Sequence, residues 1–109
     1  MIANIARYHR GSLPSKRHPE FAALNPTDRL TVLQLGGILR IADSLDRSHE
    51  GHIIDLRCSR EENIVRIQAR SAVDCESELL EADRKRELFE LAFQCQLEFS
   101  LRRVKAKEN

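Results

Sequence analysis

Tryptophan is absent from the 109-residue sequence, and the aromatic residues are limited to one tyrosine and four phenylalanines. No apolar run approaches the roughly 18 residues that a membrane-spanning helix needs, and the N-terminus lacks a signal-peptide pattern. Charge of one sign is also missing, because 18 basic residues face 17 acidic ones and the formal net charge is +1. These absences argue against a membrane protein and a globally basic nucleic-acid binder. They predict a soluble, cytoplasmic protein with a modest aliphatic core.

The cysteines form no recognisable motif. Cys58, Cys75 and Cys95 are odd in number, widely spaced and without any CxxC pair. This pattern argues against a disulfide framework and against a structural zinc site, and predicts reduced thiols. The sequence also has no glycine-rich phosphate loop and no GxSxG nucleophile motif. We therefore predict no catalytic residue, no metal site and no cofactor within this chain.

The most informative stretch runs from Asn25 to His49. Asn25 can cap a helix, Pro26 suits its first position, and Asp28 places negative charge in the first turn. The helix expected here, over about 26–49, carries two apolar stripes and is therefore predicted to be buried nearly all round. One stripe comprises Leu30, Leu33, Gly37, Ile38, Ile41 and Leu45; the other comprises Val32, Leu35, Gly36, Leu39 and Ala42. Since two adjacent glycines weaken a helix, we expect another helix to cross closely at Gly36-Gly37.

Apolar periodicity predicts an α+β fold around this helix. The N-terminal part is expected to be a helix over 1–10 followed by a polar loop. From Gly51 the period changes to two, which predicts a β-hairpin over about 54–58 and 65–69. A helix over about 78–94 follows, and residues 96–102 favour a strand, with continuation of the helix as the alternative. The expected C-terminal unit is β-β-α-β with a small antiparallel sheet.

A basic region near the N-terminus is the first candidate binding site. Guanidinium groups can fork onto phosphate oxygens, and lysine and histidine add further donors, so such a cluster suits a polyanion. The alternative is a solvated surface in which Arg7 or Arg10 pairs with Asp43 or Asp46. The candidate residues are Arg7, His9, Arg10, Lys16, Arg17 and His18.

Three segments carry a family resemblance: ARYHR at Ala6–Arg10, LPSKRHPEF at Leu13–Phe21 and LRIADSLDRSH at Leu39–His49. They resemble, in the same order, the C-terminal region of the exopolyphosphatase / guanosine pentaphosphate phosphohydrolase (Ppx/GppA) family. The resemblance implies that residues 1–50 are a partial helical domain similar to the HD phosphohydrolases, and that 51–109 form a small C-terminal α/β region. The family's two actin-like catalytic lobes have no counterpart in this sequence.

The resemblance also implies a ligand. In that family the helical and C-terminal domains help to line a polyphosphate channel, so the basic region, with Arg47 added, is expected to bind polyphosphate or a phosphorylated nucleotide. Asp43 lies where an HD-type metal site would place its last aspartate. Such a site also needs a His-Asp doublet, which this sequence lacks. Asp43, Asp46 and His49 are therefore interpreted as a remnant of that site or as members of structural ion pairs, such as Asp43–Arg47 and Asp46–His49.

Two functional hypotheses follow. In the first, the chain is a non-catalytic portion of a Ppx/GppA phosphatase that binds a phosphate-rich anion, with the catalytic lobes as a further partner. In the second, it is a stand-alone dimerisation or docking module without anion affinity. A homodimer is expected in either case, with domain swapping as one route, because few elements are available to cover the central helix. We expect the two central helices to cross at Gly36-Gly37.

Overall fold

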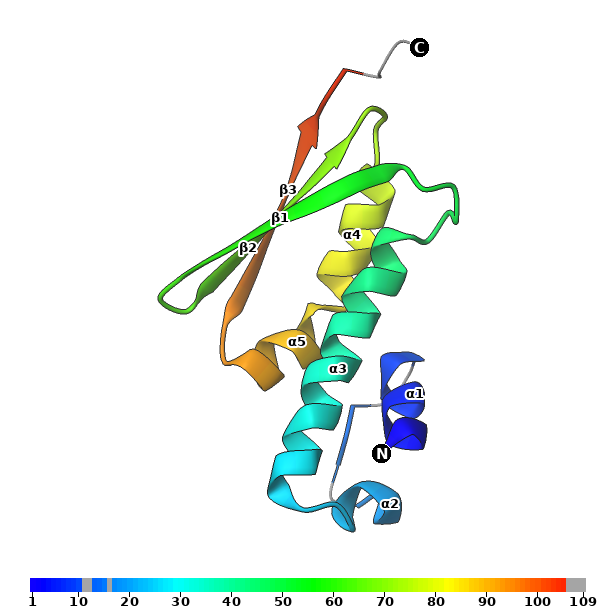
Figure 1. The fold of residues 1–109 in the computed structure, drawn as a ribbon, viewed down its shortest axis with the longest axis vertical. Coiled ribbons are helices and arrows are strands. Elements are labelled where there is room, and N and C mark those ends of the chain that lie inside the picture. Colours follow the sequence, from blue (N-terminus) through cyan, green and yellow to red (C-terminus); the bar gives the residue numbers. More distant parts are fainter. Residues whose placement is uncertain (11–12, 16, 106–109) are drawn as a thin grey trace.

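The computed structural model describes residues 1–10, 13–15 and 17–105, except for the side chains of residues 9 and 10. The described part is elongated, 53 × 31 × 21 Å, and confirms the α+β class. The helices are α1 (Ile2–Arg10), α2 (Pro19–Ala22), α3 (Pro26–Leu45), α4 (Glu76–Arg84) and α5 (Arg86–Phe93); the strands are β1 (Ile53–Glu61), β2 (Ile64–Ser71) and β3 (Gln96–Arg103). The sheet lies at one end, α1 and α2 lie at the other, and α3 runs between them (Figure 1).

The predicted start of α3 is confirmed, but its end falls earlier than residue 49. The Asn25 side chain accepts a hydrogen bond of 2.8 Å from the backbone N–H of Asp28, and Pro26 opens the helix. The helix stops at Leu45. Residues 46–49 form a turn, and His49 takes a positive φ of 56°, which a right-handed helix excludes. Gly51, at φ 63°, then redirects the chain towards β1.

The close helix crossing at the two glycines is confirmed. A Cβ atom on Gly37 would lie 2.8 Å from the Phe89 Cα atom, so the backbone of α5 passes directly over this position. A Cβ atom on Gly36 would lie 3.2 Å from a methyl carbon of Leu88 and 3.7 Å from the Tyr8 Cβ atom. Both positions are thus covered within the chain, by α5 and α1. The expectation that two copies of α3 cross here is wrong.

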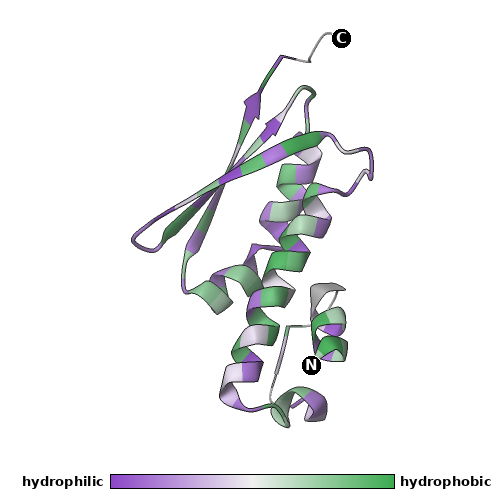
Figure 2. Cartoon of the chain, in the orientation of Figure 1, coloured by the Kyte–Doolittle hydropathy of each residue, from purple (hydrophilic) through white to green (hydrophobic). Residues whose placement is uncertain are grey.

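Burial of α3 is one-sided, which corrects the prediction of a helix buried nearly all round. Val32, Ile41 and Leu45 are buried where α1, α4, α5 and the sheet pack against the helix. On another side Leu35 and Ile38 keep 40% and 42% of their surface exposed, although hydrophobic residues occur along the whole helix (Figure 2). The apolar pattern identified the helix correctly, but the described chain supplies neighbours for only part of its circumference.

The sheet is mixed, with strand order β1-β2-β3, so the predicted antiparallel sheet is wrong for its last strand. The hairpin β1–β2 is antiparallel as expected, whereas β3 pairs parallel to β2. The reason is the connection: α4 and α5 carry the chain back along the sheet, so β3 starts at the same end as β2. The strand at 96–103 is confirmed and the helical alternative is wrong, because Leu97 is buried against the helices in a period-two pattern.

One apolar cluster joins the two halves of the chain. Ile41 and Leu45 of α3 pack with Ile67 of β2, Ala82 of α4 and Leu97 of β3. The expected division near residue 50 falls in the turn after α3, yet α3 packs against elements on both sides of it, α1 on one and α4 and α5 on the other. The single helix expected over 78–94 is two helices, with Lys85 between α4 and α5. Within the described residues, no helix combines the length and apolar character needed to cross a membrane.

Candidate functional site

The predicted basic region lies at the α1–α2 end of the molecule, and its members have different surroundings. Arg7 pairs with Glu20 at 3.4 Å, not with Asp43 or Asp46, and both side chains are exposed. Arg17 is exposed as well. The side chains of His9 and Arg10, and the whole of Lys16, lie outside the described residues. Exposed arginines on adjoining elements leave this end accessible to an anion.

His18 has a structural role. Its Nδ1 atom lies 2.6 Å from the hydroxyl of Tyr8, and the two rings stack with centroids 5.6 Å apart. Phe21 meets the Tyr8 ring edge-on at 5.7 Å. Burial raises the pKa of Tyr8, against a smaller opposing effect of Arg7, so the hydroxyl stays neutral and available for this bond. These contacts hold the loop before α2 against α1.

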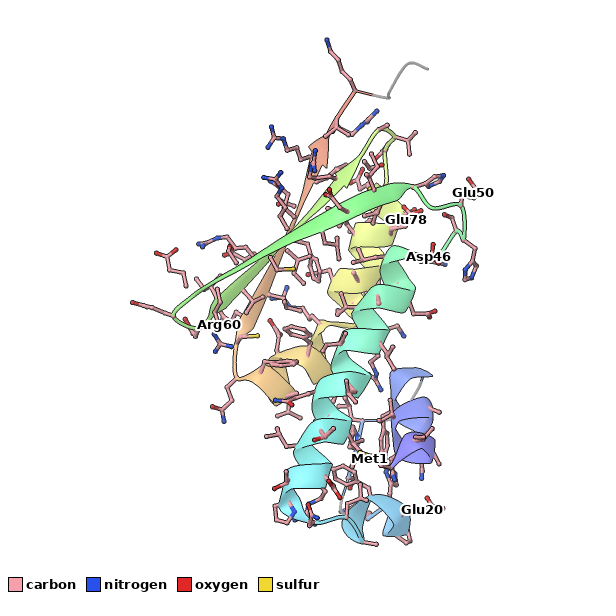
Figure 3. The ribbon with its side chains drawn as sticks, in the orientation of Figure 1. Met1, Glu20, Asp46, Glu50, Arg60 and Glu78 are labelled. Carbon is pink, nitrogen blue, oxygen red and sulfur yellow. The ribbon has the colours of Figure 1, made fainter. Side chains whose placement is uncertain are left out.

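Arg47, which was grouped with the basic region, lies at the opposite end of α3. A helix of 20 residues is about 30 Å long. Figure 3 shows the separation, with Glu20 on α2 and Asp46 at the far end of α3. Arg47 therefore does not share one compact site with Arg7, Arg17 and His18, the predicted anion-binding residues whose side chains the structure describes at the other end.

Arg47 instead belongs to a polar groove of about 550 Å³ between the end of α3 and the α4–α5 junction. We call it the cationic groove, because three permanent cations line it against two carboxylates. Of the residues predicted from sequence, it brings together Asp43, Arg47 and His49. Its lining residues are Arg40, Asp43, Ser44, Arg47, His49, Glu81 and Lys85.

Arg40 connects this groove to α1. Its side chain is 7% exposed, and its Nε atom donates a hydrogen bond to the backbone carbonyl of Tyr8 in the last turn of α1. Burial lowers the pKa of Arg40, an effect opposed by Glu87, but arginine remains charged at neutral pH. The hydroxyl of Ser44 donates to the Arg40 carbonyl at 2.8 Å. Arg40 was not among the predicted site residues because it falls between the apolar residues that define the helix.

The outer part of the groove is held by surface ion pairs. Arg47 lies 3.2 Å from Glu81, which also lies 3.6 Å from Arg84. Asp46 and His49 are 3.5 Å apart, the pairing that their spacing allows. Exposed pairs of this kind contribute only about 0–1 kcal/mol, so an anion can replace Glu81 as the partner of Arg47 at small cost. Lys85 lies in a charge run that sequence analysis interpreted as solvated surface; its i, i+4 spacing from Glu81 was the available signal.

A second titratable cluster ties the loop before β1 to α4. The Nε2 atom of His52 lies 2.8 Å from Glu50, and its Nδ1 atom lies 3.4 Å from the buried Glu78. Burial acts to raise the pKa of Glu78, but hydrogen bonds from its own backbone N–H and from the Ser77 hydroxyl, together with the nearby His52 ring, outweigh it and hold the pKa below its usual value. Across the part of the chain that the structure describes, no three His, Cys, Asp or Glu residues could jointly hold a metal ion.

The three segments that carry the family resemblance meet at one residue. Tyr8, from the first segment, contacts His18 and Phe21 from the second and Arg40 from the third. Its ring is completely buried between them. Comparison with models of known protein families gives no match. No curated protein matches the sequence either. Family membership is therefore a proposal that rests on these segments.

Proposed function

We propose that this chain is a non-catalytic portion of a Ppx/GppA-type phosphatase, and that it binds phosphate-rich anions such as polyphosphate in the cationic groove. The observation that carries the proposal is the convergence of Arg40, Arg47 and Lys85 on one groove from α3, the turn after it and the α4–α5 junction. Three cations from separate elements fit a ligand with several phosphate groups better than a single small anion.

The residues of the cationic groove have different roles in the proposed binding. Arg47 can direct two N–H groups at neighbouring phosphate oxygens, and Lys85 supplies a point charge on the opposite wall. Arg40 is buried and fixed by Tyr8, so it contributes a constant positive field. Asp43 and Glu81 oppose the anion, which predicts modest affinity and strong dependence on salt.

A longer polymer has a route out of the groove. Because Arg40 contacts the Tyr8 carbonyl, the groove adjoins the last turn of α1, where the segment ARYHR ends. Beyond it lie the exposed Arg7 and Arg17. A polyphosphate chain that follows this side of the molecule would contact both basic regions. The proposal assigns binding only; hydrolysis belongs to the family's catalytic lobes, and we expect the isolated chain to hydrolyse neither polyphosphate nor guanosine pentaphosphate.

Titration calorimetry with polyphosphate of defined chain length, at several salt concentrations, measures the affinity and tests the proposal. The double variant Arg47→Gln/Lys85→Gln should lower affinity by about tenfold or more and flatten the dependence on salt, since two phosphate contacts are lost. The matched control Arg102→Gln/Lys105→Gln removes the same charge from exposed positions in and just after β3. Equal losses in both variants would mean that only net charge matters, and the groove assignment would be wrong.

A further inference from the structure

The helices cover the inward face of the sheet unevenly. In the register of the hairpin, Leu56 of β1 lies opposite Ala69, and Cys58 lies opposite Ile67, so each pair points to the same face. Ala69 and Ile67 are buried beneath the helices, whereas Leu56 is 44% exposed and Cys58 is exposed. The other edge strand, β3, is covered, since its Leu97 is almost fully buried. Among the described strands, β1 therefore has the most exposed inward-facing side chains.

Helix α3 presents a second uncovered apolar surface. Leu35, Ile38, Leu39 and Ala42 are all exposed, and their spacing of three, four and seven places them on one stripe. A stripe of this kind is the surface that a packed helix normally buries. It lies away from Gly36 and Gly37, which α1 and α5 cover.

These two surfaces are continuous. A groove of about 290 Å³ is lined by Ala42 and Leu45 from α3 and by Ile53 and Leu56 from β1, with Gly51 between them in the chain. Two carboxylates, Asp46 and Asp55, complete its lining. The stripe on α3 and the inward side of β1 therefore form one apolar face, which we call the β1/α3 face.

We propose that the β1/α3 face binds a second copy of this chain, with the two β1 strands paired antiparallel about a two-fold axis through Leu56. This register places Leu56 on Leu56 of the second copy at the inward side. On the outward side it places Asp55 opposite Arg57 twice, once in each direction. Since Asp55 already lies 2.7 Å from Arg70, each carboxylate would sit between two guanidinium groups.

Neighbouring registers are less favourable, which gives the pairing its specificity. If one β1 strand slipped by a single residue along the other, inward-facing side chains would lie opposite outward-facing ones. The two-fold axis can therefore pass only through a residue, and not between two residues. An axis at Arg57 places that arginine against itself. An axis at Cys58 places Asp55 opposite Glu61. Like charges directly opposite each other destabilise a strand pair, so these registers are disfavoured.

The same two-fold axis accounts for the helix stripe. An axis perpendicular to the sheet keeps both helical layers on one side of a continuous six-stranded sheet. The α3 stripes of the two copies then approach each other over the paired β1 strands, and each covers the apolar face that the other leaves open. This interface is separate from the cationic groove and does not depend on anion binding.

Light scattering coupled to size exclusion, at micromolar concentration, tests the proposal through the chain mass of 12.6 kDa. The parent chain should give twice this mass. Arg57→Asp and Asp55→Lys should each raise the dimer dissociation constant by at least about tenfold, because each places like charges opposite each other at two symmetric points. An equimolar mixture of the two variants restores opposite charges in this register and should dimerise again. Arg102→Asp, on the covered edge strand, is the matched control and should leave the mass unchanged.

Circular dichroism of each variant establishes that it is folded. A monomeric parent chain would overturn the proposal, whether or not the face binds another protein. A dimeric parent whose mass is unaffected by Arg57→Asp would place the interface elsewhere. Failure of the mixture to dimerise, with both single variants folded and monomeric, would overturn the register through Leu56.

Discussion

Gly37→Ala is expected to destabilise the protein, although alanine is the better helix former. The intrinsic gain of replacing glycine inside a helix is about 1 kcal/mol. Against it, the new Cβ atom would lie 2.8 Å from Phe89 Cα, 2.9 Å from Phe89 N and 3.3 Å from Leu88 C. All three are backbone atoms of α5, so no side-chain rotation relieves the contact. Helix α5 must move away from α3, and overpacking of this kind costs about 1–3 kcal/mol.

The net change should therefore be a loss of up to about 2 kcal/mol in the free energy of unfolding, measured by urea denaturation. Gly36→Ala is the matched control on the adjacent position. Its Cβ atom would meet the end of the Leu88 side chain at 3.2 Å, which can rotate, so this variant should be close to neutral. If Gly37→Ala is as stable as Gly36→Ala, the backbone of α5 is not as close to α3 as we describe, and the reasoning fails.

Two further predictions concern charge. Replacing Arg10, Lys16 and Arg17 together by glutamine should weaken polyphosphate binding and flatten its dependence on salt; an unchanged affinity and slope in calorimetry would restrict the anion to the cationic groove. Glu90 accepts a 2.7 Å hydrogen bond from Arg86, which is the main reason that its pKa lies below the usual value, and a second from the Leu97 N–H. A depressed carboxyl pKa stabilises the fold above the unfolded value of about 4.3 and loses that contribution as pH falls through the folded pKa. Between neutral pH and about pH 3, the free energy of unfolding should therefore fall less steeply in Glu90→Gln than in the parent. Glu62→Gln, at the hairpin tip, is the control and should follow the parent. Parallel curves of unfolding free energy against pH for Glu90→Gln and the parent would contradict this prediction.

Local chemistry made parts of the fold predictable. Asn25 and Pro26 mark the start of α3 because each satisfies a requirement of a helix N-terminus, and the structure shows both in those positions. The adjacent glycines predicted a close crossing because such a pair is costly without one. The period-two pattern over 96–102 identified β3 because its alternate residues face the helices. In each case the signal lies within a few residues of sequence.

The direction of β3 and the composition of the groove depend on longer-range geometry. Alternation gives the two faces of a strand but not its direction, which follows from the route of the connection through α4 and α5. That connection is longer than a hairpin turn and was the available signal for parallel pairing. Arg40 and Lys85 were missed because one is embedded in an apolar helix and the other in a charge run. Their meeting depends on how α4 and α5 are placed against α3.

The two proposed surfaces use different residues of the same helix, and this explains the composition of α3. Its buried side needs glycines where α1 and α5 cross, and Arg40 where α1 ends, so that side cannot be uniformly apolar. Leu35, Ile38 and Leu39 each keep about 40% of their surface exposed and Ala42 is exposed too, so packing within one chain leaves much of this stripe in water. Four aliphatic residues at helical spacing are rarely left in water without a partner. A helix with glycine and arginine at its close crossings and aliphatic residues where it is open is the pattern expected when folding uses one side and association with a second copy uses the other.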